Sequence, residues 1–166
     1  MRSTSEMEVI PTYFFDASAI VKLLAREPGH DVIDGLMSKS GRVHSSWVVL
    51  AEVLGALKGK RRRGELTDHE YGRAVYTFFH YVRTGQLHPV DLSIREGHPV
   101  LLTYEAEVFE HGKRYPKLDV ADTLQMTVIR ESFLKIFAGE SETRLVTADA
   151  ELAAAAKSEG ILVIHV

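Results

Sequence analysis

The chain has 166 residues, and 45% of them are hydrophobic, which is enough to bury the core of one domain of ordinary size. The net charge of -3 excludes a global basic field that attracts nucleic acid, so any such contact has to rely on a local patch. The absence of cysteine excludes disulfides and thiolate metal sites, and it fits a reducing compartment. We therefore expect one domain over residues 1–166, with residues 1–11 as a flexible or extended segment.

The start of the chain does not have the pattern of a signal peptide. Met1 to Glu8 is polar and holds two glutamates, whereas a signal peptide needs a basic start and then an apolar run. The longest apolar stretch, Trp47 to Leu57, is interrupted by Glu52 and is too short to span a bilayer. These features favour a cytoplasmic protein that does not contact a membrane.

The first part of the chain alternates a strand with helices. The aromatic run Thr12 to Asp16 predicts a strand, and the apolar spacing from Ser18 to Arg26 predicts a helix. Pro28-Gly29 breaks this helix. A second helix through Val32 and Met37 and a short strand over Arg42 to Ser45 are expected to follow.

The middle of the chain predicts two long helices. Ser45 or Ser46 can cap a helix that ends near Gly64. Thr67 and Glu70 have the spacing of a capping box, in which each side chain bonds the other's backbone amide, and the helix they open is expected to end near Arg83.

The last part of the chain continues the alternation of strands and helices. The expected elements are a strand at 87–90, a helix from Ser93 to about His111, a helix from Asp119 through Phe133, a strand at 144–147, a helix at 149–157 and a strand at 161–166. Such an order predicts an α/β sandwich with a central, mainly parallel sheet.

Two aspartates follow predicted strands. Asp16 ends the first strand, and Asp149 comes directly after the strand that includes Thr147. In a doubly wound fold the functional crevice lies outside the carboxyl ends of the strands, so both side chains can reach it. An ordinary N-cap is an equally good reading of Asp149 when it is considered alone.

Three further acids lie on predicted helices. Glu52 interrupts the apolar run from Val48 to Leu57, so it needs a partner unless that face of the helix meets solvent. Asp119 and Asp122 stand three residues apart and share one helical face, although an acid in a first turn also suits the helix dipole.

A cluster of these acids requires a cation. Two carboxylates about 4 Å apart repel each other by roughly 4 kcal/mol at an effective dielectric of about 20. Hard oxygen ligands without cysteine favour Mg²⁺ or Mn²⁺ over zinc, and such ions can activate water for an in-line phosphoryl displacement. The acids therefore indicate a site for a divalent cation.

Four motifs in this order resemble the PIN-domain family and, within it, the VapC ribonuclease toxins, over Tyr13 to Val166. The motifs are Phe14-Phe-Asp-Ala-Ser-Ala-Ile20, Ser45-Ser-Trp-Val-Val-Leu-Ala-Glu-Val-Leu54, Ala121-Asp-Thr-Leu-Gln-Met126 and Leu145-Val-Thr-Ala-Asp149. The resemblance rests on all four motifs standing in the family's order rather than on any one of them.

The resemblance implies a three-layer sandwich with a five-stranded parallel sheet of order 3-2-1-4-5 and hydrolysis of RNA at its carboxyl edge. Asp16 and Asp122 would be the main metal ligands, completed by Glu52 and Asp149. By the same resemblance Ser18 and Thr147 are auxiliary residues. Asp119 is an additional acid one turn before Asp122, and we favour Asp122 as the ligand because Leu124 follows it as the motif expects.

The toxin resemblance also implies partners, namely a small protein antitoxin and a second copy in a homodimer. A PIN nuclease of RNA processing or DNA cleavage and a non-catalytic PIN-like module that binds RNA or protein remain alternatives. An aspartyl-phosphate phosphatase would need a second aspartate where Ser18 stands, and a nucleotide-binding oxidoreductase would need a glycine-rich turn after Asp16.

Two surface features suggest binding. The basic cluster at the end of the Glu52 helix can hold RNA phosphates, although cations at a helix C-terminus are favourable anyway. Its members are Lys58, Lys60, Arg61, Arg62 and Arg63. The next cations to consider are Lys113, Arg114 and Lys117. On the following helix, Tyr76 and Phe79 fall outside the apolar stripe and are available for a partner surface.

Overall fold

The computed structural model describes residues 11–39, 43–90, 99–130 and 142–166. Five strands form one sheet in the order β3-β2-β1-β4-β5, and every neighbouring pair is parallel, which confirms the expected topology. The strands are β1 (Thr12–Phe15), β2 (Val43–Ser46), β3 (His88–Val90), β4 (Thr143–Thr147) and β5 (Leu162–His165). Because all strands run the same way, their carboxyl ends meet at one edge of the sheet.

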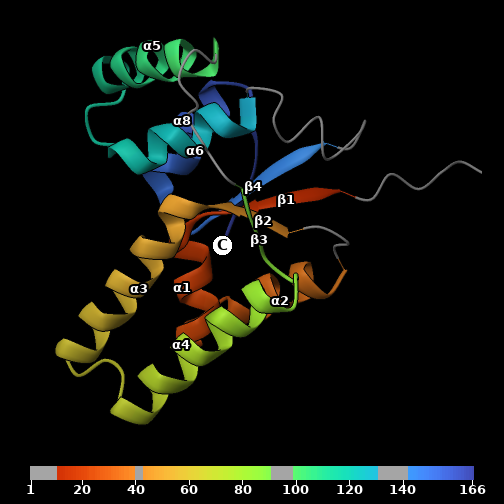
Figure 1. Ribbon diagram of the computed structural model, residues 1–166, viewed down its shortest axis with the longest axis vertical. Helices are drawn as coiled ribbons and strands as arrows, with labels where there is room; N and C mark the ends of the chain where they lie inside the picture. Colours follow the sequence, from red (N-terminus) through yellow and green to blue (C-terminus); the bar gives the residue numbers. More distant parts are fainter. Residues whose placement is uncertain (1–10, 40–42, 91–98, 131–141) are drawn as a thin grey trace, which may run out of the picture.

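Helices cover both faces of the sheet and complete three layers (Figure 1). On one face lie α1 (Ala17–Ala25), α2 (His30–Lys39), α3 (Trp47–Arg62) and α4 (Asp68–Arg83). On the other face lie α5 (Pro99–Arg114), α6 (Val120–Arg130) and α8 (Ala150–Ser158). Among the described parts of the chain, no helix is long and apolar enough to cross a membrane.

The core is divided by the sheet into two clusters. Tyr13 and Phe15 of β1 pack with the cluster under α1 to α4, whereas Phe14 packs with the cluster under α6 and α8. This alternation follows from the period of two in a strand, and it makes the central strand apolar on both faces. The burial holds β1 firmly, so the residue that follows it has a fixed position.

The helix ends largely follow the local sequence signals. Thr67 accepts a bond from the Glu70 amide at 3.2 Å and Glu70 accepts one from the Thr67 amide at 2.8 Å, which confirms the capping box. The helix expected to stop near His111 continues to Arg114. Residues 1–10, 93–98 and 131–133, which the sequence assigned to a terminal segment and two helices, lie outside the described residues.

Candidate active site

Asp16 is the most firmly held of the predicted site residues. It follows β1 at the carboxyl edge, is only 4% exposed, and caps α1 by accepting a bond from the Ser18 amide at 3.1 Å. The same oxygen, Oδ2, accepts bonds from the Thr147 hydroxyl at 2.9 Å and from the Ser18 hydroxyl. Three donors on one carboxylate oxygen stabilise its charge and fix the direction of the side chain.

Ser18 and Thr147 connect two loops at this edge. The Ser18 oxygen lies 3.1 Å from the Thr147 oxygen and accepts a bond from the Ala148 amide at 2.8 Å. Thr147 also accepts a bond from the Asp149 amide at 3.0 Å. The residues predicted as auxiliary therefore tie the end of β4 to the start of α1.

Gln125 is a site residue that sequence reasoning missed. It is fully buried in α6, and its Nε2 donates to Asp16 Oδ1 at 3.0 Å, whereas its own Oε1 is buried without a hydrogen-bond partner among the described residues. A buried amide costs free energy unless it is bonded, so Gln125 occupies this position for its contact with Asp16. The available signal was a glutamine inside the otherwise apolar end of the Asp122 motif.

Asp149 and the pair Asp119 and Asp122 bond to backbone amides at helix starts. Asp149 caps α8 by accepting bonds from Glu151 N at 2.7 Å and Leu152 N at 3.0 Å. Asp119 accepts from the Asp122 amide at 2.9 Å, and Asp122 accepts from the Asp119 amide at 3.2 Å. Asp119 is exposed, whereas Asp122 is partly buried.

Glu52 reaches the same region from the opposite layer. It lies in the second turn of α3, it is partly buried, and its Oε2 is buried without a hydrogen-bond partner among the described residues. A carboxylate oxygen in this state is costly when charged, because neither water nor a donor stabilises it. The position is explained if the oxygen serves to bind a ligand.

The acids lie close enough to one another to shift the pKa values of two of them. Burial, followed by the charges of Asp119, Asp16 and Asp122, raises the pKa of Glu52 from 4.5 to about 7. Burial, followed by the charges of Asp119, Asp16 and Asp149, raises the pKa of Asp122 from 3.8 to about 7. The fold thus brings all of the predicted acids within range of mutual repulsion.

The donor set fits a hard divalent cation, but the side chains do not converge on one point. Among the described residues, no three acidic or histidine side chains form a ready metal site, because Asp122 and Asp149 are turned toward backbone amides. The unpartnered oxygen of Glu52 and the raised pKa values show that the fold places the acids near one another. Binding of one cation by several of them would also depend on the direction of each side chain. Carboxylate oxygens are hard ligands of the kind that hard divalent cations prefer.

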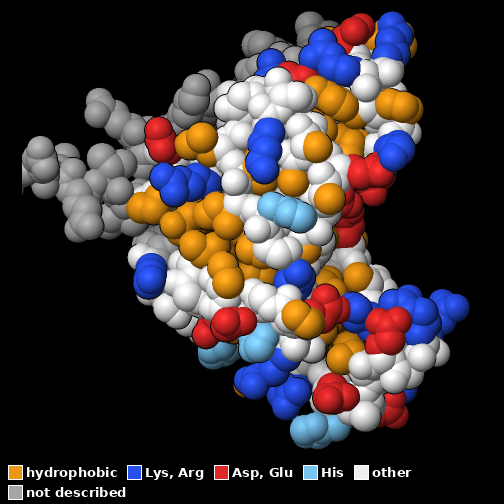
Figure 2. Space-filling model, turned by 180° about the vertical axis from the view of Figure 1, so that it is seen from behind, with side chains coloured by type: hydrophobic (Ala, Val, Ile, Leu, Met, Phe, Trp, Pro, Cys, Tyr) orange, Lys and Arg blue, Asp and Glu red, His pale blue; other side chains and the backbone are white. Residues whose placement is uncertain are grey.

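The basic cluster lies away from the acids, at the far end of α3. Arg61 to Arg63 follow Glu52 by 9 to 11 residues, which corresponds to about 14–17 Å along the helix axis. In Figure 2, which shows the molecule from behind, Lys and Arg side chains gather there below a hollow, and acidic side chains lie at the hollow's edge.

Three members of the basic cluster are already paired with acids. Lys60 contacts Glu27 at 2.5 Å and Glu65 at 2.9 Å. Arg61 contacts Asp68 at 2.6 Å, and Arg63 contacts Glu65. The other two members, Lys58 and Arg62, form no ion pair with any part of the chain that the structure describes. Only these two present charge that is not locally compensated.

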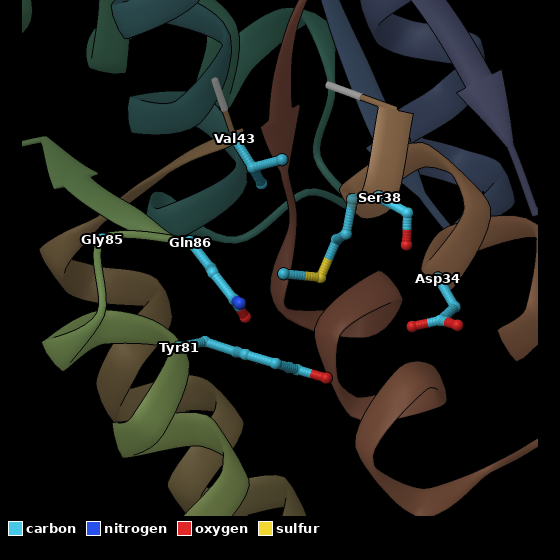
Figure 3. A pocket seen from close by; sticks show the side chains of 7 residues that line it. Asp34, Ser38, Val43, Tyr81, Gly85 and Gln86 are labelled. Atoms are coloured by element: carbon cyan, nitrogen blue, oxygen red, sulfur yellow. The ribbon is translucent and has the colours of Figure 1, made fainter. Parts of the chain in front are cut away.

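A cavity of about 520 Å³ lies between α2 and α4 (Figure 3). Asp34, Ser38, Tyr81 and Gln86 line it, together with Val43 at the first position of β2. The cavity is therefore at the amino end of the strands, and none of the predicted acids lines it. We assign the functional site to the carboxyl edge.

Comparison with known proteins agrees with this geometry. A sequence profile of the PIN domain matches residues 13–166. A search of curated proteins finds no significant match. Among solved structures, VapBC2 from Rickettsia felis, bound to a DNA fragment from their promoter, is similar with a TM-score of 0.57 and 14% identity, covering 93% of this chain and 98% of that chain.

A second solved structure, PAE2754 from Pyrobaculum aerophilum, is similar with a TM-score of 0.53 and 19% identity, covering 93% of this chain and 90% of that chain. Both structures share the fold. Because the profile match covers nearly the whole chain, this protein belongs to the PIN domain family, which is a family of nucleases.

Proposed function

We propose that the protein is a metal-dependent endoribonuclease that hydrolyses phosphodiester bonds in RNA, with Asp16, Glu52, Asp122 and Asp149 as its catalytic acids. The observation that carries this proposal is the crowding of carboxyl groups at the carboxyl edge, where burial and then the charges of neighbouring acids raise the pKa values of Glu52 and Asp122 to about 7. Strongly shifted pKa values gather at functional sites, where a bound ligand can offset the crowded charge.

Each acid has its own part in holding the cation. Asp16 Oδ2 already accepts three bonds, so Oδ1, with the single bond from Gln125, is the oxygen left for a metal. Glu52 offers its unpartnered Oε2 from the α3 side. Asp122 and Asp149 complete the set from α6 and α8. Bound Mg²⁺ or Mn²⁺ would supply an activated water and would offset negative charge on the phosphate.

We further propose that the protein is the toxin of a type II toxin–antitoxin pair, with a small protein antitoxin and a homodimeric state. The similarity to VapBC2 and the coverage of 98% of that chain support this assignment. On α4, Tyr76 is 67% exposed and Phe79 is 40% exposed, which suits a surface that a protein partner covers. Growth arrest after induced expression tests the toxin role.

The central test is Asp16→Asn. The asparagine amide would face the Gln125 donor, but Gln125 can turn its amide and accept through Oε1, so the fold is expected to survive. Loss of this ligand should lower the rate of RNA cleavage by at least about 100-fold. The matched control is Asp31→Asn, which removes the same charge from an exposed position on α2. Equal activity of the two variants would disprove the assignment.

The products provide a separate test of the chemistry. Cleavage should require Mg²⁺ or Mn²⁺, stop with EDTA, and leave a 5′-phosphate and a 3′-hydroxyl, because an activated water attacks the phosphorus. A 2′,3′-cyclic phosphate would instead mean attack by the RNA's own 2′-hydroxyl. End-labelling and mass spectrometry of the fragments distinguish the two outcomes.

A further inference from the structure

A second cavity, of about 460 Å³, lies between the α5–α6 connection and α8. Its floor is mainly apolar and includes Leu118, Ala154 and Ala155, while Arg114 and Lys117 stand at its rim. This size is within the usual range for sites that take small molecules. The cavity is therefore large enough to receive a flat organic ring.

The cavity lies next to the acidic edge, because residues that line it adjoin two of the acids. Leu118 directly precedes Asp119, and Glu151 on its rim follows Asp149 by two residues. Along α8 the lining runs from Glu151 to Ser158, which is about 3 to 14 Å beyond Asp149 along the helix axis. A chain whose phosphate lies at the acids can thus place a neighbouring unit in this cavity.

One wall of the cavity is held by a hydrogen-bond network. The Tyr115 hydroxyl lies 2.6 Å from the Ser158 oxygen and donates to Glu159 at 2.7 Å. Glu159 also contacts Arg114 at 2.5 Å and Arg130 at 3.1 Å. Three groups bonded to one carboxylate, with Ser158 attached through Tyr115, keep the wall in place, so the cavity exists before a ligand arrives.

The two rim cations differ in how firmly their acidic partners are held. The side chains of Lys117 and Glu151 are 77% and 50% exposed, so their ion pair is weak and screened. Arg114 is 59% exposed but pairs with Glu159, whose side chain is only 9% exposed. A phosphate can replace Glu151 on Lys117 at little cost, and it can reach the exposed side of Arg114 while Arg114 still holds Glu159. Figure 2 shows Lys and Arg side chains beside hydrophobic ones above the acidic side chains of the hollow.

We propose that this cavity is a subsite for one unpaired nucleobase of the RNA, next to the bond that is cut. The inference rests on the proposed nuclease function. The apolar floor covers the face of the base, and Arg114 and Lys117 bind the adjoining phosphates. A protein side chain could fill the floor equally well, but the cations at the rim and the position next to the acids favour a nucleotide.

The test combines a protein variant with altered substrates. Ala154 is exposed on α8 and lines the cavity, so Ala154→Leu fills the space with a residue that favours helix. Ala106→Leu is the matched control, because Ala106 is an exposed helical alanine on α5 that does not line the cavity. The substrates are single-stranded RNAs that lack one base at successive positions around the mapped cut.

We expect Ala154→Leu to lose the ability to distinguish complete RNA from RNA that lacks one base. For the unaltered protein and for Ala106→Leu, removal of the base at one position should lower kcat/KM about ten-fold, as expected for a stacked base. For Ala154→Leu, the same removal should have no further effect. The cavity is not a base site if Ala154→Leu distinguishes complete from abasic RNA as strongly as the unaltered protein does. The same conclusion follows if Ala154→Leu weakens binding of a protein partner and leaves RNA cleavage unchanged.

A binding measurement separates this inference from the nuclease proposal. Nucleoside 5′-monophosphates titrated into the unaltered protein should shift the methyl NMR signals of Ala154 and Ala155. If these signals move although RNA is not cleaved, the nuclease proposal fails and the nucleotide site stands. If RNA is cleaved but neither signal moves and no abasic position matters, only the base subsite is wrong.

Discussion

The acidic edge and the basic end of α3 differ in whether neighbouring charges compensate one another. At the edge, Glu52 and Asp122 lie among other carboxylates, and the pKa of each is raised to about 7. At the end of α3, Glu65 lies between Arg63 and Lys60, whose bonds and charges lower its pKa to about 2. The acidic edge holds like charges close together, whereas at the end of α3 basic and acidic side chains pair with one another.

This difference separates function from local stability. Paired charges at an exposed helix end satisfy one another and need no further ligand. Crowded carboxylates destabilise the folded chain, so their retention indicates a use outside folding. A cluster of charges visible in the sequence therefore has to be judged by whether the fold compensates it.

The largest effect is expected from a comparison of two glutamates. Glu52→Gln should lower RNA cleavage by about 100-fold or more, because an anionic ligand is lost from the metal site. Glu65→Gln removes the same charge in the basic region and should leave kcat/KM unchanged. Steady-state kinetics of both variants measure the contrast, and a similar loss in both would contradict the division between the two regions.

The second expected effect is on stability as a function of pH. In metal-free protein the folded state binds more protons than the unfolded chain between about pH 4 and pH 7, because the pKa values of Glu52 and Asp122 are raised. The free energy of unfolding should therefore fall as the pH rises through this range. Glu65 acts oppositely: its lowered pKa stabilises the fold above about pH 4.5, and this is lost as the pH falls toward 2.

Urea unfolding in EDTA at pH 5 and pH 7.5 measures this slope. Glu52→Gln should reduce the loss of stability between the two values, whereas Glu65→Gln should not. Mn²⁺ at 100 times its Kd should add about 2.7 kcal/mol at pH 7.5, since it binds only the folded state. A slope of unchanged size in Glu52→Gln would show that its carboxyl does not carry the shift.

The smallest expected effect concerns the basic cluster. Replacing Lys58 and Arg62 by alanine should flatten the dependence of log K on log salt for single-stranded RNA by about 1.4, at about 0.7 for each phosphate contact. Replacing Arg61 and Arg63 should change the slope less, because these cations are paired with Asp68 and Glu65. Fluorescence anisotropy across a salt series decides whether the pairing matters, and equal slopes for both variants would show that it does not.

Much of the fold was predictable because its signals are local. The aromatic run that ends in Asp16, the capping box of Thr67 and Glu70, and Ser46 as the cap of α3 all appear in the structure as expected. Strand order is not a local property, and the order 3-2-1-4-5 came from the resemblance to a family. Helix ends such as Arg114 were less predictable, because packing against α6 extends a helix beyond its own sequence signals.

The sequence by itself determined which acids are present and that each stands at the end of a strand or on a helix near the sheet edge. Only the tertiary structure decided how they are supported. Gln125 meets Asp16 across 109 positions of the chain, and Lys60 meets Glu27 through the packing of α1 against α3. Hydrophobic periodicity predicts which face of a helix is buried but not which polar group it will meet, because contacts between distant segments depend on the packing of the whole core.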